Sequence, residues 1–291
     1  MYNRDYIIYL FVESGGLTME RKLIAIDLDG TTLNNESKIT SETFHVIQKI
    51  LKQGHIVSIA TGRSYRKSFH LYDELQLQTP IVNYNGALSH FPGQDNWKYG
   101  YHKKLDLDLA FSLKTLNTEP DINLIAAETT ERVYIDRTKE EYKSQHIPFQ
   151  LIDATISPFD EMNLIEDPTS VSVYTPLYEN IPAIQDKILD QFGQKVAVQT
   201  WGGPTPTLEI VASGIQKAMG VESIAAYYDI KPTNILAFGD EANDYEMIQY
   251  AGHGVMMKNG IDDLKNVADD ITEFSNDENG LAKYLKNYFK V

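Results

Sequence analysis

The sequence predicts an α/β protein in which a parallel sheet, covered by helices on both faces, is interrupted by a separate α+β domain. Two short apolar runs, Leu23–Ile26 and Ile56–Ala60, each end in a loop of polar residues and glycine. Runs of this kind are typical of parallel strands buried on both faces. From residue 87 onward, aromatic, alternating and proline-containing segments replace these runs. This change of pattern predicts three parts: an N-terminal extension at 1–18, a core at 19–86 and 209–291, and an inserted α+β domain at 87–208.

The first strand opens a βαβ unit. Apolar side chains recur at helical spacing from residue 39 to 53, where Thr40 or Ser41 can cap the helix and Gly54 can end it. Strand, helix and strand within about 35 residues predict a right-handed crossover, so that Ile56–Ala60 lies parallel to Leu23–Ile26. A second helix over 64–75 and a third strand over 80–87 are expected to follow.

Inside the inserted domain the alternating segments predict strands and two longer periodic segments predict helices. The expected strands are Trp97–Tyr101, Ile122–Ala127, Arg132–Ile135, Ser170–Tyr174 and Val196–Trp201, and the expected helices are Leu105–Leu116 and Ile181–Phe192.

The parallel sheet is expected to resume after the insertion. The predicted elements are a strand at Leu208–Val211, a helix at Gly214–Tyr228, a strand at Asn234–Phe238, short strands near 252–257 and 269–271, and a closing helix at Gly280–Phe289.

Composition excludes several classes of protein. The net charge of −15 argues against a nucleic-acid-binding or anionic-membrane surface. With no cysteine, the chain has neither disulfides nor thiolate chemistry. No apolar stretch approaches the ~20 residues that cross a bilayer, so a cytoplasmic location is expected.

Residues 1–18 look detached from the core, and two explanations stay open: Met19 is the natural start, or the segment is an extra edge strand. The oligomeric state cannot be inferred.

The strongest motif is Asp27-Leu28-Asp29-Gly30-Thr31-Thr32, directly after the first strand. Reactive groups of open α/β sheets lie beyond the carboxyl ends of the strands, and residues two apart in an extended segment point to one side. Two adjacent carboxylates repel unless a cation or a shared proton relieves them, which suggests a metal site, a nucleophile with an acid/base partner, or both. The alternative is a strand that ends in a simple Asx turn.

Two further strand ends carry polar groups. Thr61-Gly62-Arg63 follows the second strand and offers a hydroxyl, backbone donors and a guanidinium to an anion, although a plain turn with a surface arginine is the alternative. Asp240 and Asp244 follow the strand at 234–238 and are one helical turn apart, which also fits a capped helix start.

Together with Lys217 in the first turn of its helix, these groups predict a site for phosphoryl transfer. Oxygen-only ligands favour a hard cation such as Mg²⁺, and a hydroxyl and a lysine beside it would neutralise phosphoryl oxygens.

The segments DLDGTTL, TGR, GIQKAMG and GDEAND, in this order, resemble the four motifs of the haloacid dehalogenase-like (HAD) superfamily. The insertion after the third strand resembles the Cof-type branch, which implies a Rossmann-like core with a C2-type cap. Ala218 departs from the glycine that is common in that branch. The resemblance covers the chain from Lys22 to its end.

The resemblance also implies residue roles. Asp27 would be the nucleophile that forms an aspartyl-phosphate, and Asp29 would protonate the leaving alcohol and then deprotonate water. The implied phosphate-binding residues are Thr61, Gly62, Lys217 and Asn243, with Arg63 and Asn85 as possible substrate contacts. The implied Mg²⁺ ligands are Asp27, Asp240 and the backbone carbonyl of Asp29. Asp244 would support the ion directly or through a water molecule.

The predicted function is a Mg²⁺-dependent phosphatase (EC 3.1.3 class) that hydrolyses a small phosphorylated metabolite such as a sugar phosphate, with the inserted domain as a lid. Two alternatives are a phosphomutase or phosphotransferase that uses the same aspartyl-phosphate, and a non-catalytic sensor of a phosphorylated ligand. A small-molecule phosphate ester is the expected partner.

Overall fold

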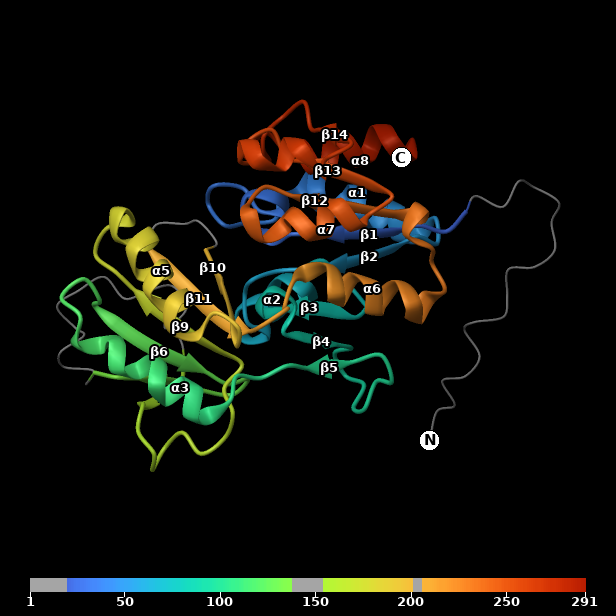
Figure 1. The fold of residues 1–291 in the computed structure, drawn as a ribbon. Coiled ribbons are helices and arrows are strands. Elements are labelled where there is room, and N and C mark those ends of the chain that lie inside the picture. Colours follow the sequence, from blue (N-terminus) through green and yellow to red (C-terminus); the bar gives the residue numbers. More distant parts are fainter. Residues whose placement is uncertain (1–19, 138–153, 201–205) are drawn as a thin grey trace.

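A five-stranded parallel sheet forms the centre of the computed structural model, which describes residues 20–137, 154–200 and 206–291 (Figure 1). The predicted extension at 1–18 lies outside these ranges. Every pairing in the sheet is parallel, as the sequence predicts. In spatial order the strands are β14 (Asp270–Ile271), β13 (His253–Met256), β12 (Ile235–Gly239), β1 (Leu23–Ile26) and β2 (Ile56–Ile59).

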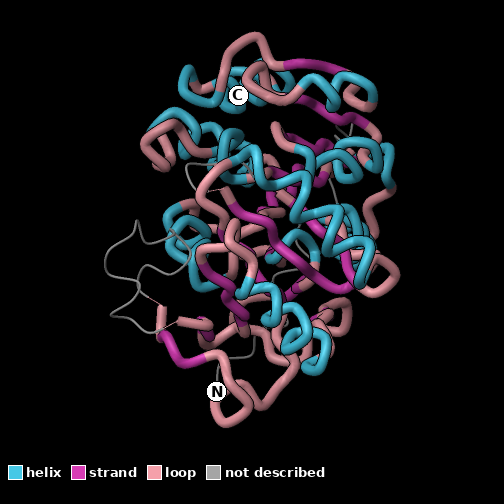
Figure 2. The backbone as a smooth tube through the Cα atoms, turned by 60° about the vertical axis from the view of Figure 1, so that its left-hand side comes forward, coloured by secondary structure: helices cyan, strands magenta, loops and turns pink. Residues whose placement is uncertain are grey.

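Helices cover both faces of this sheet (Figure 2). One face packs on α1 (Ser41–Lys52), α2 (Tyr65–Glu74) and α8 (Gly280–Phe289), and the other on α6 (Lys217–Tyr228) and α7 (Tyr245–Tyr250). β1 and β2 are buried along their whole length and, apart from Ser58, apolar, because neither face of the sheet meets water there. In the described ranges, none of the helices is both long and apolar enough to span a membrane.

A small antiparallel sheet continues the central sheet beyond β2. It contains β3 (Ile81–Asn83), β4 (Leu88–His90) and β5 (Tyr101–His102), and a parallel bridge between Ala60 and Val82 connects it to the end of β2. The sequence assigns β4 and β5 to the insertion, but β4 pairs with the third strand of the core and β5 pairs with β4.

The second large sheet is mixed and has six strands, with α3 (Leu107–Lys114) and α5 (Ile181–Phe192) packed on one face (Figure 1). We call this sheet with its two helices the cap. In spatial order its strands are β10 (Val196–Gln199), β11 (Thr207–Ala212), β9 (Ser170–Tyr174), β6 (Leu124–Glu128), β7 (Val133–Ile135) and β8 (Ile156–Pro158).

Strand β11 corrects one prediction. The apolar segment Leu208–Val211 is not part of the parallel sheet but pairs antiparallel with β9 and β10. Leu208 and Ile210 pack under the cap helices, while Glu209 points to the opposite face, so the strand follows the two-residue alternation of a sheet with unlike faces. We propose that the cap ends after Ala212 instead of at residue 208.

Candidate active site

Acidic residues far apart in the sequence meet at the carboxyl ends of β1 and β12. The two strands pair in parallel with Ile26 beside Phe238, and the backbone N–H of Asp27 donates to the carbonyl of Phe238 (3.1 Å). Asp27 directly follows β1 and Asp240 directly follows β12. Oxygens of Asp27, Asp240 and Asp244 all lie within 4.8 Å of one another. We call these three carboxylates the acidic centre.

Lys217 joins two members of the acidic centre. Its Nζ lies 2.7 Å from Oδ1 of Asp27 and 2.7 Å from Oδ1 of Asp244, and the side chain is 1% exposed. Burial alone would lower the pKa of Lys217, but the carboxylates of Asp244 and Asp27 raise it above its ordinary value. Lys217 is therefore a fixed positive charge between the two acids.

One lysine does not balance three buried carboxylates. Burial raises the pKa of Asp27 to about 7, with Lys217 opposing the shift and Asp244 and Asp29 adding to it. Burial, followed by the charges of Asp27 and Asp244, raises the pKa of Asp240 to about 9. A group of oxygen donors with excess negative charge fits a hard divalent cation such as Mg²⁺.

The loop after β1 is built around Asp240. Gly30 has φ +74°, and a Cβ atom at this position would lie 2.0 Å from Oδ2 of Asp240, so only glycine allows this approach. The Thr31 hydroxyl donates to Oδ1 of Asp240 (2.8 Å), and the Thr32 hydroxyl donates to the carbonyl of Asp27 (2.5 Å). The contact that Thr31 makes could not be predicted, because a Thr after a Gly in a turn is common without such a contact.

Asp244 has two roles that the sequence left as alternatives. Its Oδ2 accepts the backbone N–H groups of Asp240 (3.0 Å) and Glu241 (3.1 Å), which caps the turn before α7. Its Oδ1 accepts the Lys217 ammonium. The helix cap therefore also holds Lys217 in place.

The side chain of Asp29 pairs with Arg63. The guanidinium donates from Nε to Oδ2 (2.7 Å) and from Nη2 to Oδ1 (2.5 Å). Arg63 is buried, whereas the Asp29 side chain is 47% exposed. Such a two-bond pair fixes the orientation of the carboxylate.

Thr61, Gly62, Asn85 and Asn243 belong to one connected group. The backbone N–H of Asn85 donates to the carbonyl of Thr61 (3.1 Å), and the Asn243 amide donates to Oδ1 of Asn85 (2.8 Å). Thr61 Oγ1 accepts the backbone N–H of Arg63 (3.1 Å), and Gly62 lies against the Asn85 side chain. The residues that the sequence singled out thus lie in two adjoining groups around the end of the sheet.

Two buried glutamates of the cap were missed. Glu209 Oε2 accepts the Asn85 amide (2.5 Å), and Glu128 Oε1 accepts Arg66 (2.7 Å) and the Tyr84 hydroxyl (3.3 Å). Burial, followed by the charge of Glu128, raises the pKa of Glu209 to about 8, and burial raises the pKa of Glu128. The available signal was a single acid in each of two apolar strand segments.

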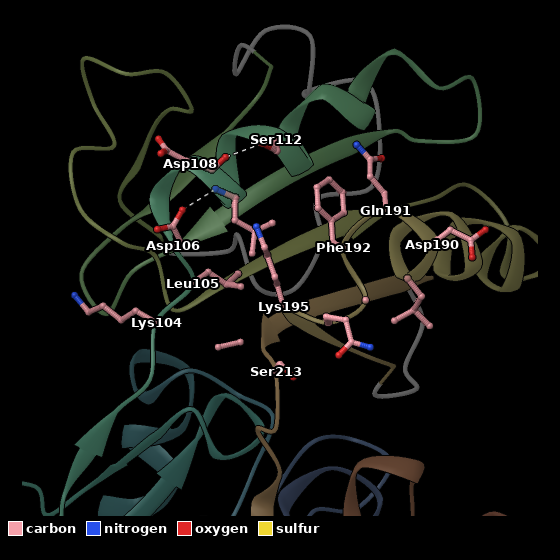
Figure 3. A pocket seen from close by; sticks show the side chains of 15 residues that line it. Lys104, Leu105, Asp106, Asp108, Ser112, Asp190, Gln191, Phe192, Lys195 and Ser213 are labelled. Carbon is pink, nitrogen blue, oxygen red and sulfur yellow. Dashed lines mark hydrogen bonds between the residues drawn. The ribbon is translucent and has the colours of Figure 1, made fainter.

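A separate pocket of about 1230 Å³ lies among the ends of α3 and α5 and the segments that enter and leave the cap (Figure 3). Lys104, Asp106, Lys195 and Ser213 are among the residues that line it. None of the residues that the sequence singled out does so, which separates this pocket from the acidic centre.

Residues 24–285 match a family model described as haloacid dehalogenase-like hydrolase. The chain is 39% identical, over 94% of its length and all of the relative's, to the 5-amino-6-(5-phospho-D-ribitylamino)uracil phosphatase YitU of Bacillus subtilis. It is 30% identical, over 91% of its own length and 96% of the relative's, to YwtE of Bacillus subtilis, which is also named a 5-amino-6-(5-phospho-D-ribitylamino)uracil phosphatase.

Solved structures show the same fold. A haloacid dehalogenase-like hydrolase from Bacteroides thetaiotaomicron matches with a TM-score of 0.75 at 24% identity, over 93% of this chain and 100% of that one. SMU.1108c from Streptococcus mutans matches with a TM-score of 0.77 at 23% identity, over 94% of this chain and 100% of that one.

Proposed function

The chain belongs to the haloacid dehalogenase-like hydrolases and is a phosphatase, and from this premise we propose that it hydrolyses a small phosphomonoester with Mg²⁺ through an aspartyl-phosphate. The observation that carries the proposal is the contact of Lys217 with both Asp27 and Asp244, beside Asp240. This arrangement joins a carboxylate nucleophile to a fixed positive charge and to an oxygen-rich cation site.

Asp27 is the nucleophile in this proposal. Lys217 holds Oδ1 of Asp27, which leaves Oδ2 to attack phosphorus while the bond from phosphorus to the ester oxygen breaks. Water then attacks the phosphorus of the aspartyl-phosphate, phosphate leaves, and the carboxylate of Asp27 is restored. Covalent catalysis of this kind divides one difficult displacement into two easier steps.

Asp29 is the proton carrier. It gives a proton to the departing ester oxygen and takes one from the attacking water. Since Arg63 holds both of its oxygens, we assign Arg63 the role of orienting Asp29.

The remaining residues bind the cation and the phosphoryl group. Asp27, Asp240 and the backbone carbonyl of Asp29 would hold Mg²⁺, with Asp244 supporting it, and the cation would supply the charge that lets a carboxylate approach a phosphate dianion. Thr61, Gly62, Lys217 and Asn243 would bind the phosphoryl oxygens, with Arg63 and Asn85 close to them.

The relatives suggest the first substrate to test. Two that are at least 30% identical are named as phosphatases of 5-amino-6-(5-phospho-D-ribitylamino)uracil. We propose this compound, a phosphomonoester of a ribityl chain, as the candidate substrate.

The test is release of inorganic phosphate from this compound and from p-nitrophenyl phosphate. We expect turnover with Mg²⁺, loss of activity with EDTA, and a loss of at least about 10⁴-fold in Asp27→Asn, because the amide cannot act as the nucleophile. Asp95→Asn, at an exposed position, is the matched control and should keep wild-type activity. Undiminished turnover in Asp27→Asn would remove Asp27 from this role, and turnover only with a sugar bisphosphate would favour a phosphomutase.

A further inference from the structure

The two faces of the cap sheet have different chemistry. On β9, Val171 and Val173 face the cap helices, so Ser170 and Ser172 face the other way. Glu128 of β6 lies opposite Ser170, and Glu209 of β11 lies opposite Ser172. Because residues paired across a sheet share a face, two carboxylates and two hydroxyls lie together on the face away from the helices. We call this the polar face of the cap.

The polar face is turned toward the proposed phosphate loop of the core. Glu209 contacts Asn85, whose backbone N–H donates to the carbonyl of Thr61. Glu128 contacts Tyr84, whose backbone N–H donates to the carbonyl of Arg63 (3.2 Å). Each glutamate thus contacts a residue whose backbone is hydrogen-bonded to the Thr61–Arg63 loop.

A structural role alone does not explain why position 209 carries a carboxyl group. The side chain is 3% exposed, and among the described residues no lysine or arginine lies within 4.0 Å of its carboxylate, in contrast to Glu128, which pairs with Arg66. A buried carboxylate without a cation is costly, and a glutamine would accept the Asn85 amide equally well.

Two amide oxygens near Glu209 lack a hydrogen-bond donor among the described residues. Gln199 of β10 lies opposite Glu209, and its Oε1 has no hydrogen-bond partner in the part of the chain that the structure describes. The same holds for Oδ1 of Asn243 on the core side. Buried acceptors of this kind call for donors, and a carboxylate repels a second anion.

We propose that Glu209, assisted by Glu128, binds the leaving group of the substrate by accepting hydrogen bonds from its hydroxyl or amino groups. The substrate class is a phosphomonoester of a neutral or cationic polyhydroxylated group, and monoesters that carry a carboxylate or a second phosphate are rejected. This inference rests on the proposed phosphatase function and adds the chemistry that selects the leaving group.

The experiment compares D-ribitol 5-phosphate with n-pentyl phosphate, which has the same chain length and no hydroxyl groups. For the wild-type protein we expect kcat/KM to be higher for D-ribitol 5-phosphate by at least about tenfold, since a hydrogen bond to a charged group contributes about tenfold to hundredfold. In Glu209→Gln this ratio should fall by about tenfold or more. Glu128→Gln, which keeps an acceptor for Arg66 and Tyr84, should lower the ratio as well.

A second arm tests for a gain. Both arms are measured at pH 9, where Glu209, whose pKa is about 8, is ionised. With 3-phosphoglycerate, whose leaving group carries a carboxylate, Glu209→Gln should then raise kcat/KM because it removes the repelling charge. A residue that only supports Asn85 gives no such gain. Glu161→Gln, an exposed glutamate of the cap, is the matched control and should change neither the ratio nor the activity on 3-phosphoglycerate.

The outcomes separate the inference from the proposed function. If the wild-type protein releases phosphate from none of these monoesters or from p-nitrophenyl phosphate, the proposed function fails and the inference fails with it. If the wild type is active but shows no preference for D-ribitol 5-phosphate, or if Glu209→Gln changes all substrates by one common factor, only the inference is overturned.

Discussion

At the scale of single residues, the pair of Asp29 and Arg63 leads to the first prediction. Arg63→Lys keeps the positive charge but loses the two-bond fork, so Asp29 is oriented less well. We expect kcat/KM for n-pentyl phosphate, whose alkoxide needs a proton, to fall by about tenfold or more. For p-nitrophenyl phosphate, whose phenolate leaves unprotonated, the loss should be small. Measured rates of phosphate release from the two esters check this.

Arg132→Lys, at an exposed position of the cap, serves as the control for this experiment. An equal loss on both esters would mean that Arg63 acts on binding of the phosphoryl group and not through Asp29.

Glu209 leads to a prediction about pH and stability. Its pKa is about 8 in the folded protein, raised by burial and Glu128 from an ordinary value of 4.5. Glu209 therefore binds its proton more tightly in the folded state than in the unfolded state. The resulting contribution to the free energy of unfolding is fully present below pH 4.5 and is lost as the pH rises through 8. Glu209→Gln should melt at a similar temperature to the wild type at pH 4.5 and a few degrees higher at pH 9.

Thermal melts of wild type, Glu209→Gln and Glu161→Gln across this pH range test the prediction. A variant that is less stable than the wild type at pH 9 would show that the charge stabilises the fold, contrary to the expectation for a site that sacrifices stability for function.

At the scale of elements, the loop after β1 shows how a turn can set the position of a carboxylate. Gly30 and Gly93 have similar backbone angles, φ +74° and +77°, but a Cβ atom would clash with Asp240 only at Gly30 and meets nothing within 4 Å at Gly93. Gly93→Ala should cost about 1 kcal/mol for the left-handed backbone alone. Gly30→Ala should cost more and weaken activation by Mg²⁺, because Asp240 must move.

Denaturant unfolding and the Mg²⁺ concentration for half-maximal activity measure the two effects. Equal losses of stability and unchanged Mg²⁺ activation in both variants would contradict the role of Gly30 in placing Asp240.

The elements also show how far the sequence alone reaches. The parallel strands and the helices that cover them are predictable from the spacing of apolar residues and from the capping residues. The helix at 181–192 has the predicted bounds. Strand β11 was assigned to the wrong sheet because a segment of four residues, three of them apolar, does not reveal whether one face of the strand or both are covered. The acidic centre was predictable because each acid follows a strand end.

Glu128 and Glu209 were not predictable in the same way. Asn85 and Glu209 are 124 positions apart, and their contact depends on how the cap lies on the core, which local patterns do not encode. Thr31 was missed for a similar reason, since its partner Asp240 is 209 positions away.

At the scale of the whole molecule, the acidic centre adds local repulsion to a chain whose net charge is −15. A cation bound there should stabilise the folded state by about 2.7 kcal/mol when Mg²⁺ is present at 100 times its Kd. We expect Mg²⁺ to raise the melting temperature and EDTA to reverse the rise. NaCl at matched ionic strength is the control, and Asp240→Asn should reduce the shift; an equal rise in that variant would place the cation elsewhere.

The order of the chain separates the proposed chemistry from the proposed selection. Asp27, Lys217 and Asp240 lie outside the segment from α3 to β11, whereas Glu128 and Glu209 lie within it. Mutations in that one continuous stretch can alter which alcohol is released and leave the reacting groups intact. Gene duplication followed by drift in this stretch would give a group of enzymes that share one reaction but act on different substrates.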